Sequence, residues 1–124
     1  MSPNILCIED NPDNLLLVQR ALVARGYNFA GAASGVSGLE QADAGAPDLI
    51  LVDINLPDID GYEVTRRLRA HDRLGDVPII AITANALKGD AEKALAAGCD
   101  AYMAKPIDIR ELWTRVGALL PEFG

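Results

Sequence analysis

Carboxylates follow two of the short apolar segments of this chain. Glu9 and Asp10 come directly after the segment Ile5 to Ile8. Asp53 comes directly after Leu49 to Val52. In open α/β sheets, ligands gather outside the carboxyl ends of the strands, near the point where the strand order reverses. Three carboxylates meeting there would repel one another by about 4 kcal/mol per pair at an effective dielectric constant near 20, so the cluster needs a cation or a shifted protonation state.

A hydroxyl and a lysine occupy the equivalent places on two further segments. Thr83 closes the apolar run that begins at Pro78, and Lys105 follows Ala101 to Ala104. Taken singly, each of these residues is explained by helix capping, a turn or a surface charge. Oxygen ligands without a nearby histidine or cysteine suit Mg²⁺, which commonly accompanies phosphate. The convergence of the four strand ends therefore favours a magnesium site.

The segments that must position these side chains alternate between strand and helix patterns. Five apolar runs recur at intervals of roughly 20 to 25 residues, and each is followed by a segment of helical period. This alternation predicts an α/β fold with a parallel five-stranded sheet. The expected strands are Ile5 to Ile8, Tyr27 to Ala33, Leu49 to Val52, Pro78 to Ile82 and Ala101 to Ala104, of which the second is the least hydrophobic and is expected at an edge.

Five helices are expected between and after these strands. Gly26, Gly45 and Gly98 are expected to end three of them. In the last helix, apolar residues recur at three- and four-residue steps, so one face, including Trp113, is expected to lie in the core. The expected helices are Pro12 to Arg25, Ser34 to Ala44, Asp60 to His71, Leu87 to Ala97 and Asp108 to Leu120.

Together these motifs resemble the receiver domain of two-component response regulators. The resemblance covers almost the whole chain and rests on Glu9-Asp10-Asn11, Asp53 with Leu56-Pro57 and Gly61, Thr83-Ala84, and Lys105-Pro106. It implies a flavodoxin-like (βα)5 fold, a doubly wound parallel sheet with strand order 2-1-3-4-5, for which a receiver is a standard example. Residues 1–124 are expected to form one such domain.

The resemblance implies a chemical role for each residue of the cluster. Asp53 would be the phosphoacceptor, a carboxylate nucleophile that attacks phosphorus in line. Lys105 and the Thr83 hydroxyl would neutralise or bond the phosphoryl oxygens. The ligands of Mg²⁺ would be Asp10, Asp53, the backbone carbonyl of Asn55, and Glu9 through a metal-bound water.

A conformational switch is also implied. Tyr102 would be the switch aromatic, whose ring moves inward when the Thr83 hydroxyl turns toward the phosphoryl group. The small side chain of Ala84 would leave space for that group. The peptide bond between Lys105 and Pro106 is expected to be cis, since only X-Pro bonds adopt that geometry at low cost.

The implied function is that of a signalling receiver in a two-component system or phosphorelay. A histidine kinase or histidine phosphotransfer protein would donate the phosphoryl group, and a downstream protein would bind the face formed by residues 87–97, 101–104 and 108–120. The chain would catalyse only its own Mg²⁺-dependent phosphorylation and a slow autodephosphorylation. Few residues follow the last expected helix, which favours a stand-alone receiver. Residues 83–90 also resemble receivers fused to hybrid histidine kinases, so an excised receiver domain is the alternative.

Two other functions fit the residues less well. A phosphatase with an aspartyl-phosphate intermediate usually needs a second acid two residues after its nucleophile, and Asn55 stands at that position. A flavodoxin must hold a phosphate in its first loop, which the acidic run from Glu9 to Asp13 would repel.

A docking site for the phosphoryl donor is expected on the first helix. Leu17, Val18, Ala21 and Leu22 form one stripe that can face the sheet. Leu16 and Val23 fall on the opposite side, with Gln19 between them. These three residues are expected to contact the histidine-bearing helix of the partner.

Composition narrows the remaining classes of partner. Eighteen acidic and eleven basic residues give a net charge of −7, which disfavours nucleic acid and anionic membranes. The N-terminal residues show no signal peptide or membrane span, so a cytoplasmic location is expected. His71 is the single histidine, and the two cysteines lack a C-x-x-C spacing, so neither a zinc centre nor a Ser-His-Asp site can be built.

Overall fold

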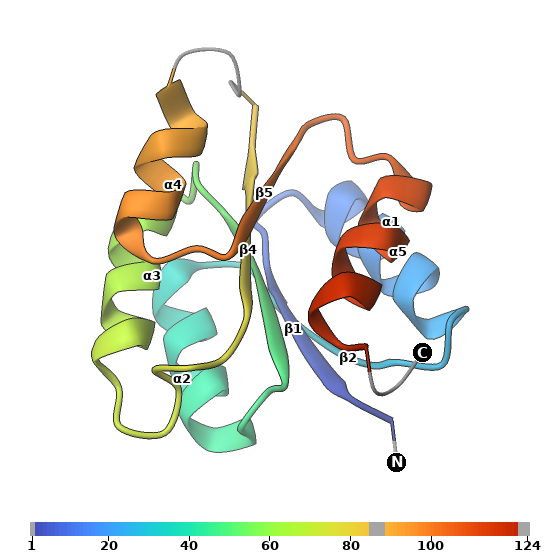
Figure 1. Ribbon diagram of the computed structural model, residues 1–124, viewed down its shortest axis with the longest axis horizontal. Helices are drawn as coiled ribbons and strands as arrows, with labels where there is room; N and C mark the ends of the chain where they lie inside the picture. The colour runs from blue at the N-terminus through green and yellow to red at the C-terminus, as the bar shows by residue number, and fades with distance from the viewer. Residues whose placement is uncertain (1, 85–88, 122–124) are drawn as a thin grey trace.

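Strands and helices alternate along residues 2–84 and 89–121, the part of the chain that the computed structural model describes (Figure 1). The strands are β1 (Asn4–Ile8), β2 (Asn28–Ala32), β3 (Leu49–Asp53), β4 (Ile79–Thr83) and β5 (Ala101–Ala104). The helices are α1 (Pro12–Val23), α2 (Gly35–Gly45), α3 (Gly61–Ala70), α4 (Ala91–Ala97) and α5 (Ile109–Leu119).

The strands form one parallel sheet in the order β2-β1-β3-β4-β5, which confirms the predicted topology. The strand order reverses between β1 and β3, because the chain leaves β1 toward β2 and returns to β3 on the other side. At that point Ile8 is in register with Val52, and Asp53 is in register with Ile82 of β4. The residues that follow β1 and end β3 therefore meet at the switch point, where ligands bind in folds of this kind.

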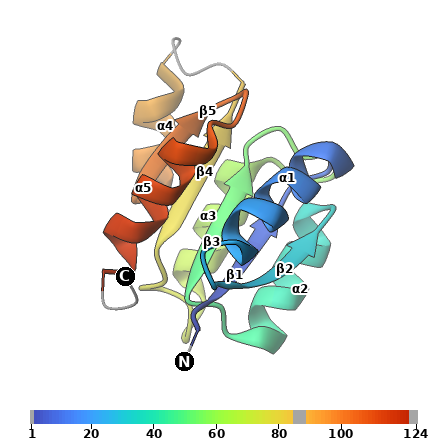
Figure 2. The same cartoon turned by 90° about the vertical axis from the view of Figure 1, so that its right-hand side faces the viewer.

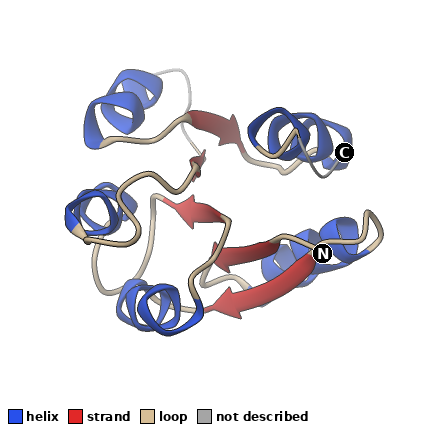
Figure 3. Cartoon of the chain, turned by 60° about the horizontal axis from the view of Figure 1, so that its bottom comes forward, coloured by secondary structure: helices blue, strands red, loops and turns tan. Residues whose placement is uncertain are grey.

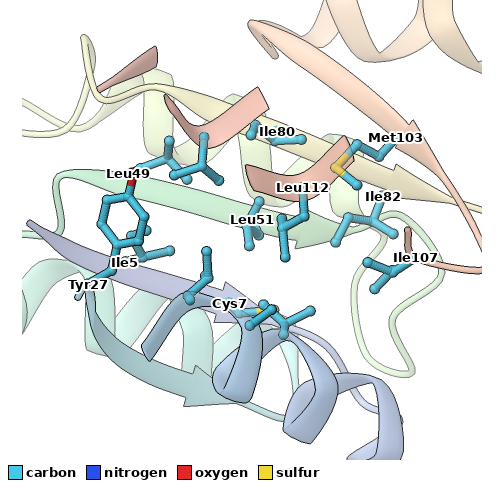
Figure 4. Close-up of a cluster of buried hydrophobic side chains, with 14 residues drawn as sticks. Ile5, Cys7, Tyr27, Leu49, Leu51, Ile80, Ile82, Met103, Ile107 and Leu112 are labelled. Atoms are coloured by element: carbon cyan, nitrogen blue, oxygen red, sulfur yellow. The ribbon is translucent and has the colours of Figure 1, made fainter. Parts of the chain in front are cut away.

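Helices cover both faces of the sheet. Figures 1 and 2 show α1 and α5 on one face, and Figure 3 shows the sheet between this layer and the layer of α2, α3 and α4. Alternate strand residues supply the two cores: Ile5 and Cys7 face α1 and α5, whereas Leu6 and Ile8 face the other layer. The first core is drawn in Figure 4. Every residue of β3 and of β4 is buried, as expected for central parallel strands.

Helix ends agree with the predictions in part. Gly98 ends α4 in the left-handed region with φ of 113°, and Gly26 (φ 88°) lies beyond the end of α1. Gly45, in contrast, is still helical, and Ala46 takes the left-handed position with φ of 48°. The predicted start of the fourth helix, Leu87, lies outside the described residues.

None of the described helices has the length and apolar character needed to cross a membrane.

The expected burial of Trp113 is wrong. Its indole is only partly buried, Nε1 donates a hydrogen bond of 2.8 Å to the carbonyl of Ala21, and the Arg25 guanidinium lies 4.1 Å from the ring centroid. The indole N–H needs an acceptor, which places the ring at the border between α1 and α5. Leu112 and Val116 of the same helix are fully buried, so the apolar stripe of α5 is narrower than predicted.

Candidate functional site

Three carboxylates come together at the carboxyl ends of β1 and β3. Glu9, Asp10 and Asp53 each offer one oxygen, and these oxygens all lie within 4.8 Å of one another. Glu9 and Asp53 are each 1% exposed, whereas Asp10 is exposed. The backbone N–H of Glu9 donates to the Ala32 carbonyl at 2.9 Å, which extends the register of β1 by one residue and fixes where the first carboxylate begins.

Lys105 supplies the positive charge of the cluster. Its Nζ lies 2.9 Å from Oδ2 of Asp53 and 3.0 Å from Oε1 of Glu9. The backbone N–H of Lys105 donates to the Thr83 carbonyl at 2.8 Å, and the peptide bond to Pro106 is cis. One ammonium group therefore contacts two of the three acids.

The Asp53 carboxylate is held from both sides. Oδ1 accepts a hydrogen bond of 2.9 Å from the backbone N–H of Asn55, while Oδ2 faces Lys105. α3 begins very close to this strand end, since a Cβ on Gly61 would lie 2.5 Å from the Asp53 carbonyl oxygen. Only glycine permits this approach, which is the physical reason for the Gly61 of the sequence motif. Contacts on both oxygens therefore fix the orientation of the Asp53 carboxylate.

Burial and mutual contact shift the pKa values of the two buried acids, Glu9 and Asp53, in opposite directions. Burial, together with the neighbouring Asp53 carboxylate, raises the pKa of Glu9 to about 7. Burial also opposes ionisation of Asp53, but hydrogen bonds from Glu9 and Lys105 outweigh it, and the pKa of Asp53 stays below its ordinary value. For Lys105, contacts with both acids outweigh its desolvation and raise its pKa. At neutral pH Asp53 and Lys105 are thus ionised, whereas burial beside Asp53 favours the protonated form of Glu9.

These donors fit a hard divalent cation. Three carboxylate oxygens within reach of one another, one of them on the exposed Asp10, offer oxygen ligands and access from solvent. The predicted fourth protein ligand, the Asn55 carbonyl, belongs to the residue whose N–H bonds the Asp53 carboxylate. A cation at this place would also balance the excess of carboxylates over the single ammonium group.

The Thr83 hydroxyl is directed to a partner that the sequence did not reveal. Thr83 is buried at the end of β4, and its Oγ1 donates to Oδ2 of Asp90 at 3.0 Å. The hydroxyl of Tyr62 on α3 donates to the other oxygen of Asp90 at 3.3 Å. Tyr102, the predicted switch aromatic, is partly buried and packs against the core beneath α2, α3 and α4. Tyr62 and Asp90 are 28 positions apart, and a contact over this separation produces no periodic pattern in the sequence. Their roles could therefore not be identified from the sequence.

The predicted docking residues lie on the outer side of α1, which faces away from the core. Leu16 is 44% exposed and Val23 is 53% exposed, and Gln19 is exposed between them. Val18 and Leu22 on the opposite side of the helix are fully buried in the core. The helix therefore presents two apolar side chains to solvent, in the orientation that its sequence predicts.

Comparison with known proteins finds relatives over most of the chain. Residues 5–117 match the family model of the response regulator receiver domain. The polar-differentiation response regulator DivK of Brucella ovis is 41% identical over 109 residues, which cover 88% of this chain and 89% of DivK.

Solved structures show the same similarity in three dimensions. The receiver domain of the sensor histidine kinase PA1611 from Pseudomonas aeruginosa, crystallised with a magnesium ion in its active-site cleft, is 40% identical, with a TM-score of 0.90 and coverage of 98% of this chain and 99% of that one. A CheY-like receiver domain protein from Methanospirillum hungatei is 30% identical, with a TM-score of 0.89 and coverage of 98% and 96%. The acid cluster, the topology and these relatives agree: the chain belongs to the response-regulator receiver domain family.

Proposed function

We propose that residues 1–124 act as a phosphorylatable receiver that accepts a phosphoryl group on Asp53 and changes its protein contacts in response. The observation that carries this proposal is the contact of Lys105 Nζ with both Asp53 and Glu9, beside the exposed Asp10. A nucleophilic carboxylate, a fixed cation and a set of oxygen ligands are the parts that phosphoryl transfer to an aspartate requires.

Magnesium is the proposed cofactor. Asp10, Asp53 and the Asn55 carbonyl would bind it directly, and Glu9 would bind it through water. When bound, it would neutralise charge on the phosphoryl oxygens. The P. aeruginosa relative holds magnesium in its active-site cleft, which supports the same assignment here.

The protein residues perform the remaining chemistry. An oxygen of the ionised Asp53 forms the new bond to phosphorus while the bond from phosphorus to the donor breaks. A phosphohistidine of a histidine kinase or phosphotransfer protein is the proposed donor, and its imidazole leaves. Lys105 stabilises the negative charge that develops on the phosphoryl oxygens. Hydrolysis of the acyl phosphate by water then returns the receiver to its starting state.

The proposed response begins at Thr83. Its hydroxyl would exchange Asp90 for a phosphoryl oxygen, and Tyr102 would move inward into the space that this movement leaves. β5 carries Tyr102 and lies between α4 and α5, so a downstream protein that contacts the α4-β5-α5 face would sense the change. The proposed docking site of the donor is separate from that face and consists of Leu16, Gln19 and Val23 of α1. Both partners are proteins in the cytoplasm in this proposal.

The experiment is phosphorylation by acetyl phosphate, followed by intact-mass measurement. We expect one added phosphoryl group in the presence of Mg²⁺ and none in excess EDTA. Base lability and acid stability of the product would identify an acyl phosphate. Labelling that is equal in EDTA would refute the role of the metal, and the absence of labelling in Mg²⁺ would refute the function. The same chemistry would operate in a free-standing receiver and in a receiver domain attached to a kinase.

A further inference from the structure

Residues 54–60 connect the phosphoacceptor strand β3 to α3 and contain one of the proposed metal ligands, the Asn55 carbonyl. The ends of this loop are fixed by backbone bonds of 2.9 Å: Ile54 N–H donates to Ile82 of β4, and Gly61 N–H donates to Ile54. Mg²⁺ requires nearly ideal octahedral coordination. The Asn55 carbonyl can therefore bind it only if the loop between these two ends is also held in place.

Asp58 ties the middle of the loop to a different helix. Its two carboxylate oxygens accept one hydrogen bond each from the first N–H groups of α2, from Gly35 at 2.8 Å and from Val36 at 2.9 Å. These N–H groups have no acceptor within the helix, and the helix terminus attracts an anion. The same bonds from Val36 and Gly35 lower the pKa of Asp58, so its carboxylate is charged at neutral pH.

Packing reinforces this connection. A Cβ on Gly35 would lie 2.4 Å from Cγ1 of Ile59, so the first turn of α2 lies directly against the loop. α2 and α3 are neighbours in the same layer (Figures 1 and 3). Within residues 2–84 and 89–121, the loop side chains that make hydrogen bonds are Asp58 and Asp60, and Asp60 bonds only the N-terminus of α3, the helix that follows it. Among the described residues, Asp58 is therefore the loop residue whose side chain bonds an element other than β3 and α3.

We propose that Asp58 is a positioning residue for the metal site, which holds the Asn55 carbonyl in place by anchoring its loop to the N-terminus of α2. This role rests on the proposed magnesium site. The proposed role of Asp58 differs from simple helix capping, because a second residue already caps α2. The Ser34 side chain accepts a hydrogen bond of 3.1 Å from Ser37 N–H. The two caps can be removed separately, and only one of them touches the loop.

The test compares Asp58→Ala with Ser34→Ala in the full chain. Both variants remove a side-chain acceptor from the first turn of α2. Mg²⁺ is titrated by calorimetry and by the shift of the Asn55 amide resonance, and acetyl-phosphate labelling is measured at saturating Mg²⁺. We expect the Kd for Mg²⁺ to rise about tenfold or more in Asp58→Ala, as for the loss of groups that orient metal ligands, with little change in the labelling rate at saturation. In Ser34→Ala the Kd for Mg²⁺ should stay close to that of the parent.

The conservative variant Asp58→Asn keeps one acceptor oxygen and should give an intermediate Kd. A parental Kd in Asp58→Ala would overturn the positioning role and leave only a capping function. An equal rise in both alanine variants would also overturn it, because the effect would then pass through the stability of α2. Absence of Mg²⁺ binding by the parent protein is a distinct result, which would overturn the metal site itself together with this role.

Discussion

The Thr83 hydroxyl donates a hydrogen bond of 3.0 Å to Oδ2 of Asp90, the residue before α4. Phosphorylation as proposed must exchange this bond for one to the phosphoryl group, so Asp90 opposes the switch. We expect Asp90→Ala to bind beryllofluoride, a phosphoryl mimic, about fivefold more tightly, because a net hydrogen bond contributes about 1 kcal/mol. The measurement is a fluoride-dependent titration in Mg²⁺, followed by NMR.

Tyr62→Phe is the matched control for Asp90→Ala. It removes the bond from the Tyr62 hydroxyl to the other oxygen of Asp90 and leaves the bond from Thr83 in place. Its beryllofluoride affinity should remain closer to that of the parent. Unchanged or weaker affinity in Asp90→Ala would show that Asp90 does not restrain Thr83.

Magnesium affinity should depend on pH through Glu9. Its pKa of about 7 means that a proton must leave before this carboxylate can serve the metal site. We expect the apparent affinity to fall as pH drops below 7, by up to about tenfold per pH unit, and to level off above it. Glu9→Gln should lose this dependence. Calorimetric titrations across this range would contradict the assignment if the parent and the variant had the same pH profile.

The same pKa predicts a change of stability with pH in Mg²⁺-free buffer. Between pH 4.5, the ordinary pKa of a glutamate, and about pH 7, the folded state retains a proton that the unfolded chain has released. The free energy of unfolding should therefore fall as pH rises through this window, and Glu9→Gln should remove that contribution. Urea unfolding at several pH values measures it, and a contribution of opposite sign would contradict the assignment.

Lys105→Ala should fold but respond poorly to phosphorylation. The side chain is partly exposed, so its loss leaves no cavity in either core. Because Lys105 helps to lower the pKa of Asp53 and would face the phosphoryl oxygens, we expect labelling by acetyl phosphate to slow by roughly ten- to a hundredfold. The NMR changes that phosphorylation causes should also shrink. Lys93→Ala, which removes an exposed lysine of α4, should label at the parental rate, and equal rates in both variants would exclude Lys105 from the site.

The proposed docking through α1 can be tested separately from the proposed chemistry of Asp53. Leu16 and Val23 are exposed, so changing both to Ser should leave the thermal midpoint and acetyl-phosphate labelling nearly unchanged. Transfer from a cognate phosphohistidine protein should slow, because the apolar contact with its helix is lost. Equal slowing with both donors would mean that the substitutions disturb the site, and no slowing with either would leave these residues without a docking role.

The sequence predicts secondary structure best in segments whose residues are all buried. β3 and β4 are continuous apolar runs, and their predicted ends agree with the structure to within one residue, because strands buried on both faces tolerate few polar residues. The acid cluster was predictable for a related reason, since parallel strands bring their carboxyl ends to one edge. Helix ends were harder: Ala46 adopts the left-handed conformation although Gly45 stands beside it.

Long-range polar contacts could not be predicted. The bonds of Asp58 with α2 and of Asp90 with Tyr62 join residues that are 22 to 28 positions apart, and each residue alone is an ordinary surface group. The burial of Trp113 could not be predicted for a similar reason, because its hydrogen bond to Ala21 depends on how α1 and α5 pack. These contacts follow from tertiary structure and have no signature in local sequence.

The site of phosphorylation tests the central claim most directly. Borohydride reduces an aspartyl phosphate to homoserine, so peptide mass spectrometry of the reduced, acetyl-phosphate-treated protein locates the acceptor. We predict homoserine at position 53 in the parent and none in Asp53→Asn. Homoserine at position 10 or at any other aspartate, or phosphate incorporation into Asp53→Asn equal to that of the parent, would contradict the assignment of Asp53 as the phosphoacceptor.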